Sequence, residues 1–544
     1  RLVVGSVSVY KRQKKPNYLK GLRVVLAILI FVPILLFFVD FADVLPDNLH
    51  TLLHLQIMPA ILGGMAGLVV FQFVLALLFG RIYCSVICPA GVLQDIINRV
   101  FCIGKKKKKG VRRFSYHKPM NILRYSILGL TFVLAVFGMI ELCTLLDPYS
   151  NFGRIANNLF RPVVMWVNNL LADGLARMDN YTLYHVTISN VTVFGVISAL
   201  VALLVFILMV VFRGRLFCNT LCPVGTLLSL ISRYSFFRIS FDKEACTHCG
   251  NCEHTCKAEA IDSKNLTVDT SRCVDCFNCV SSCAKGGLQY RFKPSFKKEA
   301  ETARAQTDVI QQATAPNSRR TFLSAGATVA VSLPIVSTIA QGMEKGHGKG
   351  QHGQGKHGNK WPPIVPPGAI SLERFKDVCT GCQICVTQCP SHVLRPTGLE
   401  YGFDYMLKPR IAYIDSYCNY ECTVCSEVCP THAIKPLTKE EKATTQVGIA
   451  TFFINRCIVK TEGTDCGACS EHCPTQAVAM VPYKDGLTIP QVNTEICVGC
   501  GGCEYVCSAH PFRAIYIEGN PVQKEAKPFK ETETEKIEVD DFGF

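Results

Sequence analysis

Thirty cysteines occur in this 544-residue chain, and most of them stand in sets of four at short, recurring spacings. Cysteine thiolates in such sets are the usual protein ligands of iron–sulfur clusters and of tetrahedral zinc. Four of the six sets have the spacing C-x2-C-x2-C-x3-C, and the other two have a longer gap after the first cysteine. In chain order, the first to sixth sets are Cys246, Cys249, Cys252 and Cys256; Cys273, Cys276, Cys279 and Cys283; Cys379, Cys382, Cys385 and Cys389; Cys418, Cys422, Cys425 and Cys429; Cys457, Cys466, Cys469 and Cys473; and Cys497, Cys500, Cys503 and Cys507.

The spacing separates iron–sulfur chemistry from its alternatives. Zinc sites typically use two separated C-x2-C pairs, and a disulfide framework would not repeat such a spacing. The regular spacing is that of bacterial ferredoxins, where three close cysteines bind one [4Fe–4S] cluster and the fourth binds the neighbouring cluster. No C-x-x-C-H sequence occurs, so the chain has no attachment motif for c-type haem. We therefore predict six [4Fe–4S] clusters.

The shared fourth cysteine also predicts how the sets pair. Between the first two sets, apolar and polar residues alternate, which is typical of the strands in a two-cluster ferredoxin. We expect Cys283 to join the first three cysteines of the first set, and Cys256 those of the second. Among the last four sets, the outer two are regular and the inner two are variant, which favours a nested pairing of the outer two with each other. Consecutive pairing is the alternative.

Two further cysteine pairs belong to an internal repeat. The sequences GRIYCSVICPAGVL and GRLFCNTLCPVGTL share the pattern G-R-[IL]-[YF]-C-x3-C-P-x-G-x-L. A pseudo-two-fold relation between the copies would bring four thiolates together, enough for one more [4Fe–4S] cluster or a tetrahedral metal. The alternative is four buried thiols that serve only in packing. These cysteines are Cys84, Cys88, Cys218 and Cys222.

Long apolar segments set the expected fold class. The mean hydropathy is +0.24 and the net charge is +15, and the basic residues gather in short loops beside apolar segments. This distribution is typical of membrane proteins and argues against a nucleic-acid partner. We predict four spans near 22–41, 57–80, 122–146 and 186–212, with both ends of this unit in the cytoplasm and the loop 147–185 outside. The expected fold is a membrane α-helical bundle with α+β ferredoxin-like domains on both sides of the membrane.

The sequence SRRTFLSAGATVAVSLPIVSTIA at 318–340 is similar to a twin-arginine export signal. Because it has no clear cleavage site, it predicts a fifth, retained span. The glycine-rich stretch that follows contains His347, His352 and His357, which could bind metal but fit a solvated tether better. The predicted division is 1–240, helical membrane domain; 241–292, cytoplasmic two-cluster domain; 293–317, linker; 318–341, signal-anchor span; 342–368, tether; 369–517, periplasmic four-cluster domain; and 518–544, charged tail.

A quinol site is the other chemistry that the sequence suggests. Quinol oxidation releases protons, so such a site needs titratable groups at a membrane interface. On the predicted outward side stand two histidines one helical turn apart, the segment LDPYSNFGR, and a histidine before the fourth span. Taken singly, each also fits an interfacial anchor or loop contact, and the inner face beside Cys84 and Cys218 is a competing location. The candidates are His50, His54, Asp147, Tyr149, Arg154 and His185.

Together, these motifs resemble two known families. Residues 1–300, with four spans, two C-x3-C-P motifs and a ferredoxin pair, resemble the NapH family, and residues 318–515 resemble the NapG/MauM ferredoxin family. The resemblance implies a multi-subunit quinol dehydrogenase of the bacterial inner membrane, in contact with lipid and quinone. Residues 241–317 would be cytoplasmic and 342–544 periplasmic, and the electrons would go to a multihaem cytochrome or molybdoenzyme. A transmembrane electron wire without its own quinol site, and an assembly or redox-sensing factor, are the alternatives.

Overall fold

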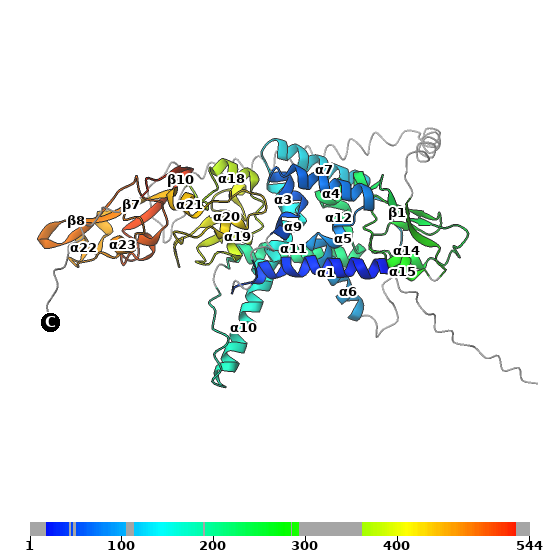
Figure 1. The fold of residues 1–544 in the computed structure, drawn as a ribbon, viewed down its shortest axis with the longest axis horizontal. Coiled ribbons are helices and arrows are strands. Elements are labelled where there is room, and N and C mark those ends of the chain that lie inside the picture. The colour runs from blue at the N-terminus through cyan, green and yellow to red at the C-terminus, as the bar shows by residue number, and fades with distance from the viewer. Residues whose placement is uncertain are drawn as a thin grey trace, which may run out of the picture. The chain divides into compact units, whose positions relative to one another are not determined.

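The structure is a computed structural model that describes residues 18–42, 45–46, 51–104, 114–188, 191–283, 285–292 and 362–528. Contacts divide the chain into two compact units, the first from residues 1–164 and 196–347 and the second from residues 165–195 and 348–544. Figure 1 shows the elements of both units. The predicted signal-anchor span 318–341, the three tether histidines and the quinol-site candidate His50 lie outside the described residues.

Helices dominate the described residues up to residue 232. In chain order they are α1 (Tyr18–Val39), α2 (Thr51–His54), α3 (Ile57–Leu62), α4 (Ala66–Phe79), α5 (Tyr83–Val86), α6 (Pro89–Gly104), α7 (Asn121–Val136), α8 (Glu141–Leu146), α9 (Pro148–Ile155), the π-helix η2 (Ala156–Phe160), α10 (Arg161–Ala176), α11 (Val193–Arg213), α12 (Leu216–Thr220) and α13 (Pro223–Ser232).

Two of these helices, α1 and α11, are long and apolar enough to cross a membrane. The predicted spans 57–80 and 122–146 are not continuous helices, because each is broken at a glycine in the left-handed region. Gly64 (φ +69°) separates α3 from α4, and Gly138 (φ +77°) separates α7 from α8. A residue in this conformation ends an α-helix. Of the four predicted spans, the described residues thus supply two as single helices, and the four-span bundle stays a proposal.

The two copies of the internal repeat fold into the same succession of elements. Each long helix, α4 or α11, ends at a left-handed glycine, Gly80 (φ +74°) or Gly214 (φ +67°). A short helix that carries the first cysteine follows, α5 in one copy and α12 in the other. Pro89 and Pro223 then begin α6 and α13, in keeping with the preference of proline for the first helical position.

A small α+β domain completes the first unit. Strand β1 (Phe237–Phe241) pairs antiparallel with β4 (Leu288–Phe292), and β2 (Ile261–Asp262) pairs with β3 (Thr267–Val268). Two short helices, α14 (Asn251–Thr255) and α15 (Asn278–Ser282), carry cysteines of the first and second sets and lie side by side near β1 (Figure 1). This pattern of an outer strand pair, an inner hairpin and two short helices is that of a two-cluster ferredoxin, as predicted.

The second unit contains two more domains of this kind. In the first, β5 (Leu394–Pro396) and β6 (Pro409–Ile411) form the inner hairpin. In the other, β8 (Val478–Pro482) and β9 (Thr488–Val492) form the hairpin, and β7 (Thr445–Phe452) pairs with β10 (Ile515–Glu525). The helices and turns between them are α18 (Leu372–Val378), α19 (Ile384–Thr387), η3 (Phe403–Tyr405), α20 (Val424–Glu427), α21 (Lys439–Thr444), η4 (Ile454–Arg456), α22 (Ile458–Thr461), α23 (Ala468–Glu471), η5 (Lys484–Gly486) and α24 (Gly502–Tyr505).

Two predicted boundaries of the four-cluster domain are wrong. Residues 518–525, expected in a charged tail, form most of β10, where Ile517 is buried and Glu518 pairs with Ile449. Residues 362–368, expected in the tether, are packed: Ile364 and Val365 are buried, and the Ile364 carbonyl accepts a hydrogen bond from Ile411 N at 2.8 Å. The charged composition of residues 518–525 concealed their strand pairing, and the proline-rich composition of residues 362–368 concealed their burial.

Candidate functional site

The structure brings the cysteines of the first two sets together across the two sets. Cys246, Cys249 and Cys252 line one cavity with Cys283 of the second set. Cys273, Cys276 and Cys279 lie close enough to Cys256, the fourth cysteine of the first set, for their charges to interact. We call the first group site 1 and the second site 2. This arrangement matches the predicted exchange of fourth cysteines.

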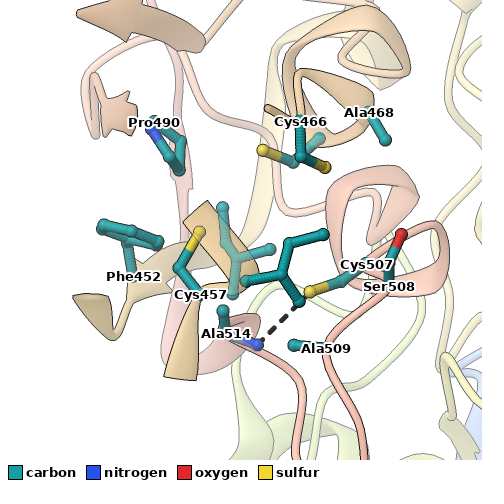
Figure 2. A pocket seen from close by; sticks show the side chains of 12 residues that line it. Phe452, Cys457, Cys466, Ala468, Pro490, Cys507, Ser508, Ala509 and Ala514 are labelled. Atoms are coloured by element: carbon teal, nitrogen blue, oxygen red, sulfur yellow. Dashed lines mark hydrogen bonds between the residues drawn. The ribbon is translucent and has the colours of Figure 1, made fainter. Parts of the chain in front are cut away.

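The last four sets pair consecutively, so the nested pairing is wrong. Site 3 comprises Cys379, Cys382 and Cys385 with Cys429, and site 4 comprises Cys418, Cys422 and Cys425 with Cys389. Site 5 comprises Cys457, Cys466 and Cys469 with Cys507, which line one cavity (Figure 2), and site 6 comprises Cys497, Cys500 and Cys503 with Cys473. The irregular spacing of the fourth and fifth sets lies within their own loops and does not change their partners.

The regular sets share one backbone conformation around the second cysteine. The residues just before and just after it are in the left-handed region, a strained conformation for side chains other than glycine. The fourth and fifth sets differ, since Thr423 (φ −112°) and Gly467 (φ −121°) follow their second cysteines. The left-handed pairs are His248 and Gly250, Asp275 and Phe277, Gly381 and Gln383, and Gly499 and Gly501.

Backbone N–H groups face the sulfurs of the fourth cysteines. In five of the six sets the fourth cysteine accepts a backbone hydrogen bond at 3.2–3.5 Å. Figure 2 shows one of these bonds, from Ala514 N to Cys507 Sγ. Such bonds stabilise a metal-bound thiolate and tune the potential of its cluster. The donors are Ala260, Gly287, Ile434, Ala477 and Ala514, and they serve Cys256, Cys283, Cys429, Cys473 and Cys507 respectively.

Burial makes these cysteines unfavourable as free anions. It raises the pKa of Cys252 and of Cys256 to about 11, with neighbouring cysteine charges adding to the effect. Iron binding must therefore displace protons from the thiols. Among the described residues, no three His, Cys, Asp or Glu side chains lie as ligands of a single metal ion. Four converging thiols, such as those that line the cavities of sites 1 and 5, fit a cubane, whose four cysteines bind four different iron atoms.

Direct contacts join site 4 to site 6 within the second unit. Cys418 N donates to the carbonyl of Cys500 at 2.9 Å, and the charges of the two cysteines interact. Tyr413 lies beside them, and its hydroxyl donates to the carbonyl of Gly499 at 2.5 Å. The four sites of this unit therefore form one series in the order 3, 4, 6 and 5.

The four cysteines of the internal repeat are at most 3 % exposed and are held by reciprocal contacts between its copies. Arg81 of the first copy donates to the carbonyl of Cys218 at 2.9 Å, and Arg215 of the second donates to the carbonyl of Cys84 at 2.6 Å. The repeat glycines make room for this, because a Cβ at Gly91 or Gly225 would stand 2.1 or 2.2 Å from those same carbonyls. This arrangement supports the pseudo-two-fold relation inferred from the sequence.

The same arginines attach the repeat to site 2. Arg81 Nη1 donates to the carbonyl of Ser271 at 3.0 Å, two residues before Cys273. Arg215 N donates to the carbonyl of Lys257 at 3.0 Å, and Lys257 directly follows Cys256. From the sequence alone, Arg81 and Arg215 were interpreted only as basic residues beside the predicted membrane spans. Their place inside both copies of the repeated motif was the signal that could have revealed this role.

An ion network lies beside the repeat cysteines and was also missed. Asp95 accepts contacts from Arg23, from Arg215 at 2.7 Å and from Lys257 at 2.5 Å. These three cations hold the pKa of Asp95 well below its usual range despite the burial that opposes it. The carboxylate of Asp95, which is 14 % exposed, thus connects α1, α6, the second repeat copy and the loop after Cys256.

The quinol-site candidates are only partly brought together. Asp147, Tyr149 and Arg154 lie on or next to α9, which is buried along its whole length and packs against α6. The segment was predicted to lie in an outer loop, so its burial corrects that expectation. His54, at the end of α2, is half-buried, whereas His185 is exposed in the second unit.

Buried polar groups connect α9 to the repeat cysteines. Asp147 accepts hydrogen bonds from Ser150 N at 2.8 Å and Ser150 Oγ at 2.6 Å, which cap the helix. α9 packs against α6, which begins directly after Cys88, and the hydroxyl of Tyr83 donates to Gln56 Oε1 at 3.0 Å. Tyr83 directly precedes Cys84 in the chain. The polar helix and the repeat cysteines, treated as separate locations in the sequence, are therefore neighbours in the fold.

Comparison with known proteins agrees with the cysteine geometry. A family model described as a 4Fe-4S binding domain matches residues 60–110 and 196–244, which include all four repeat cysteines. Two models described as 4Fe-4S dicluster domains match residues 238–284 and residues 378–433 with 464–510. The latter boundaries agree with consecutive pairing of the last four sets. No solved structure matches the chain.

Curated relatives are similar at low identity. The ferredoxin-type protein MauN of Methylobacillus flagellatus is 28% identical over 231 residues, 41% of this chain and 67% of MauN. The putative electron transport protein YccM of Escherichia coli is 27% identical, over 42% of this chain and 55% of YccM. The ferredoxin-type protein NapH of the same organism is 26% identical, over 42% of this chain and 68% of NapH. The chain is thus a ferredoxin-type iron–sulfur electron-transfer protein with multiple [4Fe–4S] sites.

Proposed function

We propose that the protein oxidises a membrane quinol in its first unit and passes the electrons through [4Fe–4S] clusters to a periplasmic redox partner. The observation that carries this proposal is the buried polar helix α9, which packs against α6 beside the repeat cysteines. Ionisable groups buried in a membrane protein are costly and usually serve a substrate or proton path. The relatives support the electron-transfer part, because YccM is named a putative electron transport protein and NapH a ferredoxin-type protein.

Quinol oxidation requires acceptors for two protons and two electrons. Each quinol that becomes a quinone releases two protons and two electrons, and clusters bound at the cysteine sets would supply the one-electron acceptors. We assign the first proton to Asp147, with His54 as the second acceptor, because a carboxylate and an imidazole can accept hydroxyl protons near neutral pH. Burial raises the pKa of Asp147, against the opposing effects of the Ser150 hydrogen bonds and the Arg154 charge, and a raised pKa makes this carboxylate a better proton acceptor.

The series of sites 3, 4, 6 and 5 supports onward transfer. Its ends would be the points of electron entry and exit, with the Cys418–Cys500 contact as its central step. In this proposal the chain combines a NapH-like part with a NapG/MauM-like part, has five spans, and places sites 3 to 6 in the periplasm. The partner would be a multihaem cytochrome or a molybdoenzyme, and other subunits would complete the complex.

Reduction of the clusters by quinol tests the proposal. The full chain is purified anaerobically, placed in lipid nanodiscs and mixed with ubiquinol or menaquinol while cluster absorbance is followed. We expect Asp147→Asn to slow reduction by about 100-fold, the size of a general-base contribution, with iron content unchanged. Asp173→Asn, at an exposed carboxylate of α10, is the matched control. If Asp147→Asn reduces its clusters at the wild-type rate, the quinol site lies elsewhere.

An electron wire without a quinol site is the second candidate. The presence of cluster sites in both units favours this function. Such a chain could carry electrons from an external donor at one unit to an external acceptor at the other. The same experiment separates the two functions. A wire is reduced by dithionite but not by quinol, and Asp147→Asn then has no effect on the rate of reduction.

The proposed topology has its own test. Sealed, right-side-out vesicles are treated with a membrane-impermeant thiol reagent after cluster removal. We expect label on Cys466 of the second unit and none on Cys249 of the first until the vesicles are opened. Labelling of both cysteines from one side would contradict an odd number of spans between them.

A further inference from the structure

Sites 1 and 2 of the small α+β domain differ in their access to solvent. The structure describes every cysteine of the six sets, and among these cysteines only Cys249 of site 1 is exposed. Its neighbours Cys246 and Cys283 are half-buried, whereas three of the four cysteines of site 2 are buried. A cluster at site 1 would therefore have the edge that a soluble redox protein can approach.

The loops of site 2 are instead attached to the helical part of the first unit. Ser271, two residues before the second cysteine set, accepts hydrogen bonds from Arg81 at 3.0 Å and from Arg124 at 3.4 Å. The carbonyl of Lys257, directly after the first set, accepts a hydrogen bond from Arg215 N at 3.0 Å. Site 2 is thus placed for exchange with the helical part, and site 1 for exchange with an external protein.

The edge of site 1 carries an excess of positive charge. Three exposed lysines stand beside residues that line its cavity: one follows Phe241 by two positions, one directly follows Ser263, and one lies between Cys283 and Gly287. These lysines, which we call the lysine surface, are Lys243, Lys264 and Lys285. None of them forms an ion pair with another residue in the described part of the chain.

Most carboxylates near this edge are engaged within the domain. Glu253 accepts backbone hydrogen bonds from two residues, at 2.9 and 3.1 Å. Asp242 pairs with an arginine of β4 at 3.2 Å, and Asp262 accepts backbone hydrogen bonds within its own hairpin turn. Of the carboxylates in residues 242–262, all of which the structure describes, only Glu244 is exposed. The lysine surface therefore keeps a net positive charge.

We propose that the lysine surface docks a small acidic one-electron carrier of the ferredoxin type, which exchanges electrons with site 1. Complementary charge steers such a partner to its docking surface and speeds its association. One electron passes from the reduced carrier to an oxidised cluster at site 1, the carrier becomes oxidised, and no bond forms or breaks. Anionic lipid also attracts lysines, but the exposed cluster ligand Cys249 favours a redox partner. This inference goes beyond the proposed function, in which quinol is the donor, and does not depend on quinol oxidation.

Association of an acidic plant-type [2Fe–2S] ferredoxin with the full chain is the first test. The anaerobically purified chain is immobilised in nanodiscs of neutral lipid, and association is followed by biolayer interferometry at low and high salt. We expect Lys243→Glu/Lys264→Glu/Lys285→Glu to lower the association rate by about tenfold or more. High salt should lower the rate of the wild type in the same direction, because it screens exposed charges.

A charge-matched variant in the second unit is the control. Lys435→Glu/Lys439→Glu/Lys484→Glu changes the net charge equally at exposed positions and should associate at the wild-type rate. An unchanged rate in the lysine-surface variant, or an equal loss in the control, overturns the proposal. The proposal also fails if the lysine-surface variant loses binding to anionic lipid vesicles while ferredoxin association is kept, because the surface is then a lipid contact.

A further variant tests site 1 as the point of electron entry. Cys249→Ala removes a ligand of site 1 and keeps the lysine surface, so we expect ferredoxin to associate normally. Iron should fall by about four atoms per chain. Reduced ferredoxin is mixed with the oxidised chain in a stopped-flow instrument, and we expect the rapid reoxidation seen with the wild type to be lost. Reoxidation at the wild-type rate in a variant that lacks this iron, or none with the wild type, overturns the proposal.

Discussion

Sites 1 to 6 hold their cysteines in one way, and the repeat site, which we define as Cys84, Cys88, Cys218 and Cys222, holds its cysteines in another. In sites 1 to 6, three ligands come from one short loop, and backbone N–H groups face the sulfurs of most fourth cysteines. In the repeat site, two pairs of cysteines from separate helices are brought together, and side chains such as Arg81 and Gln94 face the sulfurs. The first arrangement is largely local in sequence, whereas the second exists only after two distant copies have met.

This difference predicts different sensitivity to substitution. A local loop that loses one ligand can lose one cluster and leave its neighbours in place. The repeat site depends on contacts that also hold α4, α6, α11 and α13 together, since Arg81 and Arg215 each bind the opposite copy. We therefore expect damage at the repeat to spread through the first unit, and damage at a ferredoxin-type loop to stay local.

The largest effect is expected from Gly225→Ala. The new Cβ would stand 2.2 Å from the carbonyl of Cys218 and 2.9 Å from Arg81, so the contact between the copies must open. Overpacking of this kind costs about 1–3 kcal/mol or more, and the Arg81 contacts are lost as well. We expect little folded protein by size-exclusion chromatography. Gly129→Ala on α7, with no atom within 4 Å of the added Cβ, should fold normally.

The next effect is the loss of one cluster in Cys429→Ser. Cys429 belongs to the same cysteine set as three ligands of site 4, but it completes site 3. We therefore expect site 3 to lose its iron and site 4 to keep its cluster. Iron should fall by about four atoms per chain. The signal lost in EPR should match that lost in Cys382→Ser. If it matches Cys422→Ser instead, the crossed pairing is wrong.

A moderate loss of stability is expected from Arg215→Lys. Lysine keeps the charge but cannot reach Asp95 and the carbonyl of Cys84 together, contacts that Arg215 makes through Nε and Nη1. Disruption of a buried charge network typically costs about 3 kcal/mol. Thermal unfolding in detergent measures this as a lower Tm. Arg233→Lys, at an exposed position after α13, should leave the Tm unchanged.

The smallest effect is expected from Tyr413→Phe at the contact between sites 4 and 6. It removes the hydroxyl that donates to Gly499 but keeps the ring against Gly501. The loss of one buried hydrogen bond costs about 1 kcal/mol, and the iron content should not change. Differential scanning calorimetry should detect the change in the second unit. An equal change in Tyr417→Phe, at a more exposed tyrosine, would show that the hydroxyl of Tyr413 has no special role.

Features that depend on spacing within one short loop were predicted well from the sequence. The C-x2-C-x2-C-x3-C spacing identified the cysteine sets, and the exchange of Cys256 and Cys283 followed from the geometry of two-cluster ferredoxins. Consecutive pairing of the last four sets did not follow, because the spacing within a loop carries no information about which loop lies beside it. The strand pair β7 and β10 makes the last domain complete on its own.

Contacts between segments that are far apart in the sequence were harder to predict. From the sequence, the segment with Asp147, Asn151 and Arg154 was predicted to be a polar outer loop. These residues lie on or next to the buried helix α9, where backbone carbonyls accept hydrogen bonds from Asn151 and Arg154. The sequence alone predicts that Arg81 and Arg215 are charges at the ends of membrane spans, because a single basic residue in a membrane sequence is usually interfacial. Only the fold shows that each reaches across to the opposite repeat copy.

The central claim is that this chain stores and transfers electrons on cysteine-bound [4Fe–4S] clusters, and a coulometric titration tests it most directly. The anaerobically purified full chain is reduced stepwise, and the electrons accepted per chain are counted along with EPR spin intensity. Each cubane accepts one electron, so we expect about six electrons per chain from sites 1 to 6. Acceptance of no more than about two electrons, or stoichiometric zinc in place of iron, would contradict the account.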